Sequence, residues 1–80
     1  MENIVRIKEM GGAERFMTAS ALHFVIALDE LDNAAGFRRR AAAAEAGSRE
    51  RASMMTLARQ AVEFARVDRG IALTLRERGL

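Results

Sequence analysis

The sequence contains no cysteine, no proline, no tryptophan and no tyrosine. Without cysteine, the chain forms neither a disulfide nor a thiolate metal site. Without proline, no residue removes a helical hydrogen bond, which favours a helical protein throughout. His23 is the only histidine, so the two-histidine spacing of zinc sites is missing as well. We therefore expect neither a metal nor a cofactor.

Long apolar runs are also missing. No uninterrupted apolar stretch is long enough to cross a bilayer, and the chain does not open with the basic, apolar and cleavage-site series of a secretory signal. The sequence also shows no glycine-rich phosphate loop, no nucleophile elbow and no pair of carboxylates on one helix face. These patterns predict a cytoplasmic protein that does not bind membranes, and they give no support for a catalytic site.

Charge is distributed unevenly, although the net charge is only +2. Residues 1–37 carry three basic and six acidic side chains, whereas residues 38–80 carry ten arginines and five acidic side chains. Two helices of opposite sign that pack against each other, within one chain or between two chains, account for this asymmetry.

Residues 16–31 form the most apolar stretch, and its large side chains fall on more than one side of a helix. A helix that is apolar on two sides must be covered on both. Residues 13–35 are therefore predicted to form the central helix of a three-element bundle or the shared helix of a dimer. The predicted packing seam contains Met17, Ala21, Phe24, Leu28, Leu31 and Ala35. The second apolar side contains Ala19, Leu22 and Ile26, and Val25 lies between the two sides.

The rest of the chain divides into three segments. Residues 1–12 are predicted to form an N-terminal arm, either a short helix or an extended segment, that ends at paired glycines. Residues 36–48 form a connector rich in alanine and arginine, in which we expect a short, exposed helix because little is available to bury. Residues 49–78 form an amphipathic helix that folds back antiparallel and runs through Gly70.

Both ends of this last helix have recognisable signals. Ser48 is expected to cap the first backbone amides, and Gly47 suits the left-handed position after the preceding segment. Gly79 and Leu80 suit a Schellman motif, with Leu80 against Leu75. The predicted fold is all-α: a small helical bundle or antiparallel helical hairpin with a short N-terminal arm, completed by dimerisation.

Asp68 is a carboxylate near the middle of the apolar stripe of this last helix. A carboxylate in such a position needs a partner, because an unpaired buried charge is costly. Arg15, His23 or an arginine of another subunit are the candidates. The sequence therefore predicts an ion pair of Asp68 with one of these residues.

The surplus apolar surface predicts a non-enzymatic interaction protein. We expect a homodimer that binds a protein target and occludes its surface, as inhibitors, antitoxins, adaptors and virus-encoded anti-defence proteins do. The alternative is a dimeric regulator associated with nucleic acid through a basic run. Candidate interface residues are Leu22, Val25, Ile26, Met54 and Met55; the basic run consists of Arg38, Arg39 and Arg40.

Overall fold

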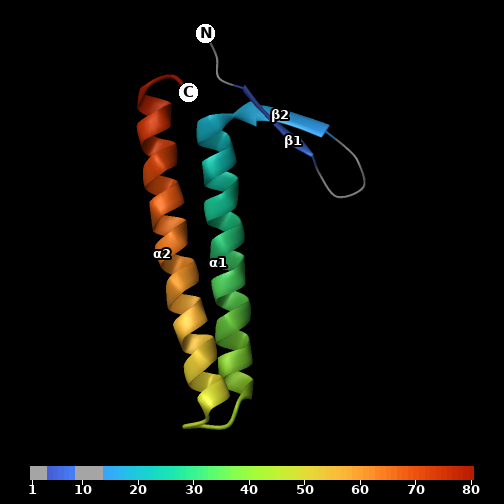
Figure 1. The fold of residues 1–80 in the computed structure, drawn as a ribbon, viewed down its shortest axis with the longest axis vertical. Helices are drawn as coiled ribbons and strands as arrows, with labels where there is room; N and C mark the ends of the chain where they lie inside the picture. The colour runs from blue at the N-terminus through green and yellow to red at the C-terminus, as the bar shows by residue number, and fades with distance from the viewer. Residues whose placement is uncertain (1–3, 9–13) are drawn as a thin grey trace.

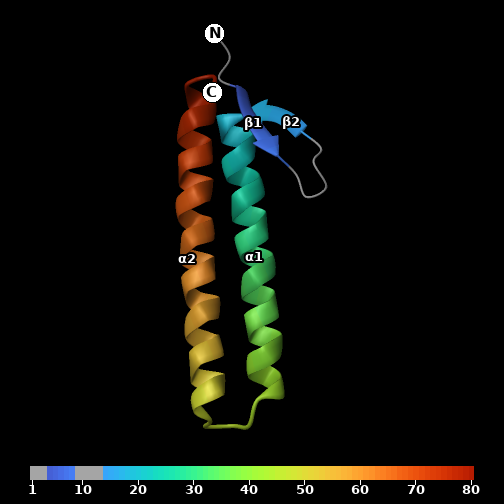
Figure 2. The same cartoon turned by 45° about the vertical axis from the view of Figure 1, so that its right-hand side comes forward.

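The residues that the structure describes form an antiparallel hairpin of two long helices preceded by two short strands. The computed structural model describes the backbone of residues 4–8 and 14–80 and the side chains of residues 17–80. Strands β1 (Ile4–Lys8) and β2 (Glu14–Thr18) are followed by helices α1 (Ala19–Ala43) and α2 (Arg49–Glu77). The helices lie side by side, and the strands project from the end at which α1 begins (Figures 1 and 2). The predicted helical hairpin with a short N-terminal arm is confirmed.

The arm is a two-stranded antiparallel sheet. Val5 pairs with Met17, and Ile7 pairs with Arg15. The helix considered for this segment is therefore wrong for residues 4–8, where the β-branched Val5 and Ile7 alternate with basic residues as strands favour. The chain break predicted at residues 11–12 lies outside the described residues.

Helix α1 begins at Ala19, later than the predicted residue 13. Residues 14–18 are held extended by pairing with β1, so they are not available to the helix. Thr18 then acts as the N-cap, because its Oγ1 accepts a hydrogen bond from the backbone N–H of Ala21 at 3.2 Å. The strand and the cap together determine where α1 begins.

Helix α1 also ends later than predicted. It continues through Gly36 to Ala43, so the predicted connector of residues 36–48 is reduced to residues 44–48. The alanine-rich segment has a surface to bury after all, because Ala41 is only 2% exposed. Ala44 is the C-cap, and Gly47, with a φ of 75°, lies in the turn rather than directly after the helix.

Helix α2 has the ends that its sequence predicts. Ser48 is its N-cap, and Ser48 Oγ accepts from the backbone N–H of Arg51 at 3.1 Å. At the other end, the N–H of Leu80 donates to the carbonyl of Leu75 at 2.9 Å, and Gly79 has a φ of 75°. This pattern is the predicted Schellman motif. The helix runs through Gly70 without a break, as predicted.

Alanines form the contact between the two helices. Buried residues recur every seven positions along each helix, which is the spacing of an antiparallel coiled coil. Small side chains in such a seam let two helix axes approach closely. The seam contains Ser20, Ala27, Ala34 and Ala41 of α1 and Ala58, Ala61, Ala65 and Ala72 of α2.

The predicted seam of α1 is therefore wrong. Leu28 belongs to the predicted seam, but it is 63% exposed, and Leu31 of the same predicted seam is exposed as well. The residues of α1 that contact α2 are Ala27 and the buried residues seven positions apart from it. They face a row of buried alanines on α2, and two rows of small side chains pack closely. Helix α1 is thus covered by α2 along its alanine line, and large apolar side chains remain outside.

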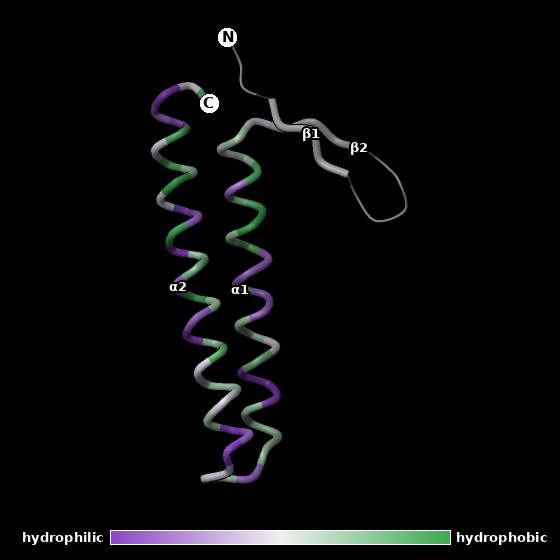
Figure 3. The backbone as a smooth tube through the Cα atoms, in the orientation of Figure 1, coloured by the Kyte–Doolittle hydropathy of each residue, from purple (hydrophilic) through white to green (hydrophobic). Residues whose placement is uncertain are grey.

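The large apolar residues of α1 concentrate in the half of the helix next to the strands, whereas its other half consists mainly of alanine and charged residues (Figure 3). Among the residues whose side chains the structure describes, every buried apolar residue is alanine. Neither α1 nor α2 combines the length and the apolar character that a membrane-spanning helix requires.

Candidate functional site

The alanine seam divides the hairpin into two faces. On a helix, the residues four positions before and three positions after a seam residue lie on one side of it, and the residues three positions before and four positions after it lie on the other side. His23 lies four positions before Ala27, and Leu31 lies four positions after it. The two residues therefore belong to different faces of the hairpin.

The first face contains a contact between the two helices. His23 Nδ1 of α1 lies 2.9 Å from Asp68 Oδ1 of α2, and the two side chains are only 28% and 19% exposed. The structure thus brings together two of the three residues considered for an ion pair. The third, Arg15, lies in β2, and its side chain is outside the described part of the chain.

A His–Asp pair occurs in catalytic triads, in which the second ring nitrogen acts on a hydroxyl. Within the described residues, no hydrogen bond links His23 to a hydroxyl group; Ser20 Oγ lies 3.2 Å from Thr18 Oγ1 instead. Residues 17–80 also contain no group of three His, Asp or Glu side chains placed to hold a metal ion. The geometry of the pair is that of a polar link between two helices.

A line of large apolar side chains runs along α2 on this same face. Leu57, Phe64 and Ile71 are spaced seven residues apart, and each directly precedes a buried alanine of the seam. All three are exposed, Phe64 by 60%. Asp68, three positions after Ala65, lies on the same side of α2 as this line. We call these three residues the Phe64 line.

The second face carries a groove between the helices. It has a volume of about 170 Å³ and an apolar floor that includes Leu31 of α1 and Val62 of α2. Leu28, 63% exposed, precedes Leu31 by one helical turn on this side. We call this hollow the Leu31 groove; it is lined by Ala27, Leu31, Val62, Ala65, Arg66 and Arg69.

The five predicted interface residues do not form one surface. Val25 is exposed, and Leu22 and Ile26 are half-buried, in the part of α1 next to the strands. Met54 and Met55 lie near the beginning of α2, next to the turn at the other end of the hairpin. The hairpin connection therefore places these two groups near opposite ends of the molecule (Figure 1).

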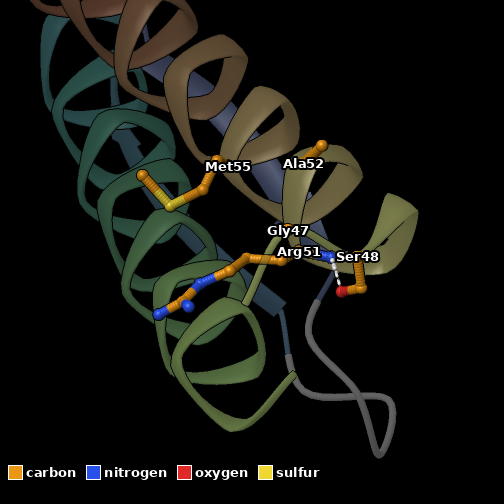
Figure 4. A pocket seen from close by; sticks show the side chains of 5 residues that line it. All are labelled: Gly47, Ser48, Arg51, Ala52 and Met55. Carbon is orange, nitrogen blue, oxygen red and sulfur yellow. Dashed lines mark hydrogen bonds between the residues drawn. The ribbon is translucent and has the colours of Figure 1, made fainter. Parts of the chain in front are cut away.

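Met55 takes part in a hollow near the turn. Its side chain and that of Arg51 extend from α2 toward α1, while Ala52 points elsewhere (Figure 4). This hollow has a volume of about 380 Å³ and is lined by Gly47, Ser48, Arg51, Ala52 and Met55. It lies at the tip of the hairpin and is separate from the Leu31 groove.

The basic run lies in the last part of α1, and Arg38, Arg39 and Arg40 are all exposed. Consecutive helical residues point about 100° apart, so the three guanidinium groups do not form one flat contact surface. Arg39 and Arg40 line a hollow that also contains Asp32, which weakens its positive field. The run therefore forms a dispersed basic region at one end of the helix.

Sequence reasoning missed the Phe64 line as an exposed feature. The amphipathic pattern of residues 49–78 predicts one apolar stripe and does not separate the buried part of that stripe from the exposed part. The position of the seam could have been predicted from alanines that recur every seven residues. They are Ala58, Ala65 and Ala72 in α2, and Ala27, Ala34 and Ala41 in α1. Two matched alanine lines identify the seam and place the larger residues beside it.

Comparison of the chain with models of protein families, with curated proteins and with solved structures gave no match.

Proposed function

We propose that this protein is a small non-enzymatic regulator that acts as a homodimer and occludes a surface of a protein target. Inhibitors, antitoxins, adaptors and virus-encoded anti-defence proteins work in this way. One observation supports the proposal most directly: the buried apolar residues among those described are all alanines, while Phe64 and Leu28 are at least 60% exposed. Large apolar side chains that a chain does not bury itself indicate surfaces that other molecules cover.

The Phe64 line is the surface that we assign to the homodimer. Its heptad spacing suits contact with another helix, and it is symmetric about Phe64. When two copies of α2 lie antiparallel, Phe64 meets Phe64 of the second copy, and Leu57 meets Ile71 of the second copy. An arrangement in which the same residues meet each other closes as a dimer with twofold symmetry.

The size of this face is sufficient for a stable dimer. Helix α2 has 29 residues, which corresponds to a length of about 43 Å at the standard helical rise. A face of that length and about 20 Å wide, the width of two helices, covers about 850 Å². Stable interfaces bury about 800 Å² on each partner. Two hairpins joined in this way form a four-helix bundle.

Substituting Phe64→Glu tests the homodimer. We expect the molar mass in solution, measured by light scattering, to change from that of a dimer to that of a monomer, because two carboxylates would be buried at the symmetry axis. Leu73→Glu is the matched control, since Leu73 is also exposed on α2 but precedes Thr74 and lies away from the Phe64 line. A monomeric wild-type protein, or an unchanged mass for Phe64→Glu, would contradict the dimer.

Binding to a protein target is tested by affinity purification from native lysate at low and high salt, with and without nuclease. We expect a stoichiometric protein partner that is retained in all four conditions, because apolar helix contacts are weakly salt-dependent. The alternative function is a nucleic-acid regulator that uses Arg38–Arg40, which are all exposed. Nucleic acid recovered only at low salt, without a protein partner, would favour that alternative.

A further inference from the structure

The Leu31 groove has a positively charged edge. Arg66 and Arg69 line it directly, and Arg59 and Arg76, each seven residues from one of these two, continue the same lines along α2. Glu63 forms an ion pair with Arg66 at 2.9 Å, and both of these side chains are largely exposed. The described part of this face thus combines an apolar floor with an excess of arginine.

From this combination we propose that the Leu31 groove binds an amphipathic helix of the target whose apolar stripe is flanked by Asp or Glu. This inference rests on the proposed function and identifies the chemistry of the partner. Leu28 and Leu31 contact the apolar stripe, as in other helix-in-groove complexes. Arg66 and Arg69 bind the flanking carboxylates, for which the planar guanidinium group is well suited.

The charges distinguish this occupant from a second copy of the chain. If two Leu31 grooves faced each other, the arginines of one copy would lie against those of the other, and like charges across an interface are unfavourable. None of the three residues of the Phe64 line is charged, and Asp68 beside it is paired with His23. The two faces therefore bind different partners, and a dimer formed through the Phe64 line leaves both Leu31 grooves accessible.

Apolar residues likewise distinguish this occupant from nucleic acid. Leu28 is 63% exposed beside the groove, and a phosphate backbone offers nothing apolar to contact it. Phosphate binding requires basic groups alone, whereas an amphipathic helix matches both the leucines and the arginines of this face.

The experiment uses three fluorescent probes and the full chain. Two synthetic helical peptides share one leucine stripe, which is flanked by Glu in one peptide and by Lys in the other; the third probe is a short DNA duplex. Binding is measured by fluorescence anisotropy. We expect the Glu peptide to bind at least about tenfold more tightly than the Lys peptide, and to bind in high salt, where the duplex does not.

Variants locate the binding to the groove. The double variant Arg66→Glu/Arg69→Glu should reverse the preference between the two peptides. Leu28→Ser should lower the affinity for the Glu peptide by at least about tenfold. Arg49→Glu/Arg78→Glu changes the net charge equally at two other exposed residues, the first residue of α2 and its C-cap, and should leave the preference unchanged. Helical content measured by circular dichroism establishes that each variant is folded.

Three outcomes would overturn the inference: equal binding of both peptides, an unchanged preference in the Arg66→Glu/Arg69→Glu variant, or binding of the duplex alone. A change to monomer mass in Leu28→Ser would also overturn it, because the groove would then be the dimer face. If a native protein partner is recovered while the Glu peptide fails to bind, the proposed function stands and the groove assignment fails. If the peptide binds but the protein is monomeric, the homodimer fails and the groove assignment stands.

Discussion

His23 and Asp68 are 45 residues apart in the sequence, and their Nδ1 and Oδ1 atoms lie 2.9 Å apart between the two helices. The contact lies near the beginning of α1 and in the second half of α2. It is a polar contact beside a seam of small apolar residues. Because alanine contacts permit sliding of one helix along the other, one specific polar contact helps to fix their register.

Removing one partner of this contact should destabilise the protein. We expect Asp68→Ala to lower the free energy of unfolding by about 1–2 kcal/mol, because His23 loses its hydrogen-bond partner in a largely buried position. Glu63→Ala is the control, because it breaks the exposed ion pair with Arg66. It should lower the free energy of unfolding by less than about 0.5 kcal/mol. Urea denaturation at a fixed protein concentration measures both.

The double variant His23→Leu/Asp68→Leu tests whether the contact contributes to stability or to register. Replacing a largely buried polar pair by leucines is often neutral or stabilising. We expect the double variant to be at least as stable as the wild type but to unfold with lower cooperativity. A double variant that is as unstable as Asp68→Ala would contradict this role.

Enlarging a seam alanine should be strongly destabilising. Ala72 is 0% exposed, so a larger side chain at this position must displace its neighbours in the seam. We expect Ala72→Leu to lower the free energy of unfolding by about 1–3 kcal/mol, because it forces the helices apart or the side chain into a strained rotamer. Ala42→Leu is the matched control, since Ala42 is exposed on α1 and the change there should be close to neutral. The midpoints of urea denaturation compare the two variants.

The features that sequence predicted well are local ones. Ser48 as the N-cap of α2 and Gly79 in a Schellman motif depend on residues within one turn of the helix end. The amphipathic pattern of α2 likewise predicted one helix through Gly70. Such features are readable from one sequence because the atoms that interact belong to neighbouring residues.

The features that sequence did not predict depend on how α1 and α2 fit together. Helix α1 has several apolar lines, and its own sequence does not show whether Leu28 or Ala27 meets the partner. That choice depends on the alanines of α2, which favour the line with matching small residues. The partner of Asp68 likewise depends on which sides of α1 and α2 face each other, so the sequence alone leaves three candidates. The beginning of α1 was missed because pairing with β1 competes with helix formation over residues 14–18.

The N-cap of α2 should contribute measurably to stability. Ser48 Oγ accepts a hydrogen bond from the N–H of Arg51, so Ser48→Ala leaves one more amide of the first turn without a partner. We expect a loss of about 1 kcal/mol in the free energy of unfolding. Ser53→Ala, an exposed serine inside the same helix, should be neutral or slightly stabilising because alanine has the higher helix propensity. Equal effects of the two substitutions in thermal denaturation would show that the cap does not contribute.

Two glycines should respond in opposite ways to the same substitution. Gly70 lies inside α2, and a Cβ atom added there meets no other atom within 4 Å. We expect Gly70→Ala to raise the free energy of unfolding by about 0.5–1 kcal/mol, because alanine has less backbone freedom to lose on folding. Gly47 also has space for a Cβ atom, but its φ of 75° is one that alanine adopts only with strain.

Gly47→Ala should therefore lower the free energy of unfolding by about 1 kcal/mol or more, although neither substitution introduces a clash. The pair separates the effect of backbone conformation from the effect of packing, because packing space is open at both positions. Thermal denaturation monitored by circular dichroism, at one protein concentration, measures both variants. Stabilisation by Gly47→Ala would show that the turn between α1 and α2 does not hold residue 47 in the left-handed conformation, and destabilisation by Gly70→Ala would show that the surface of α2 around residue 70 is covered by a partner.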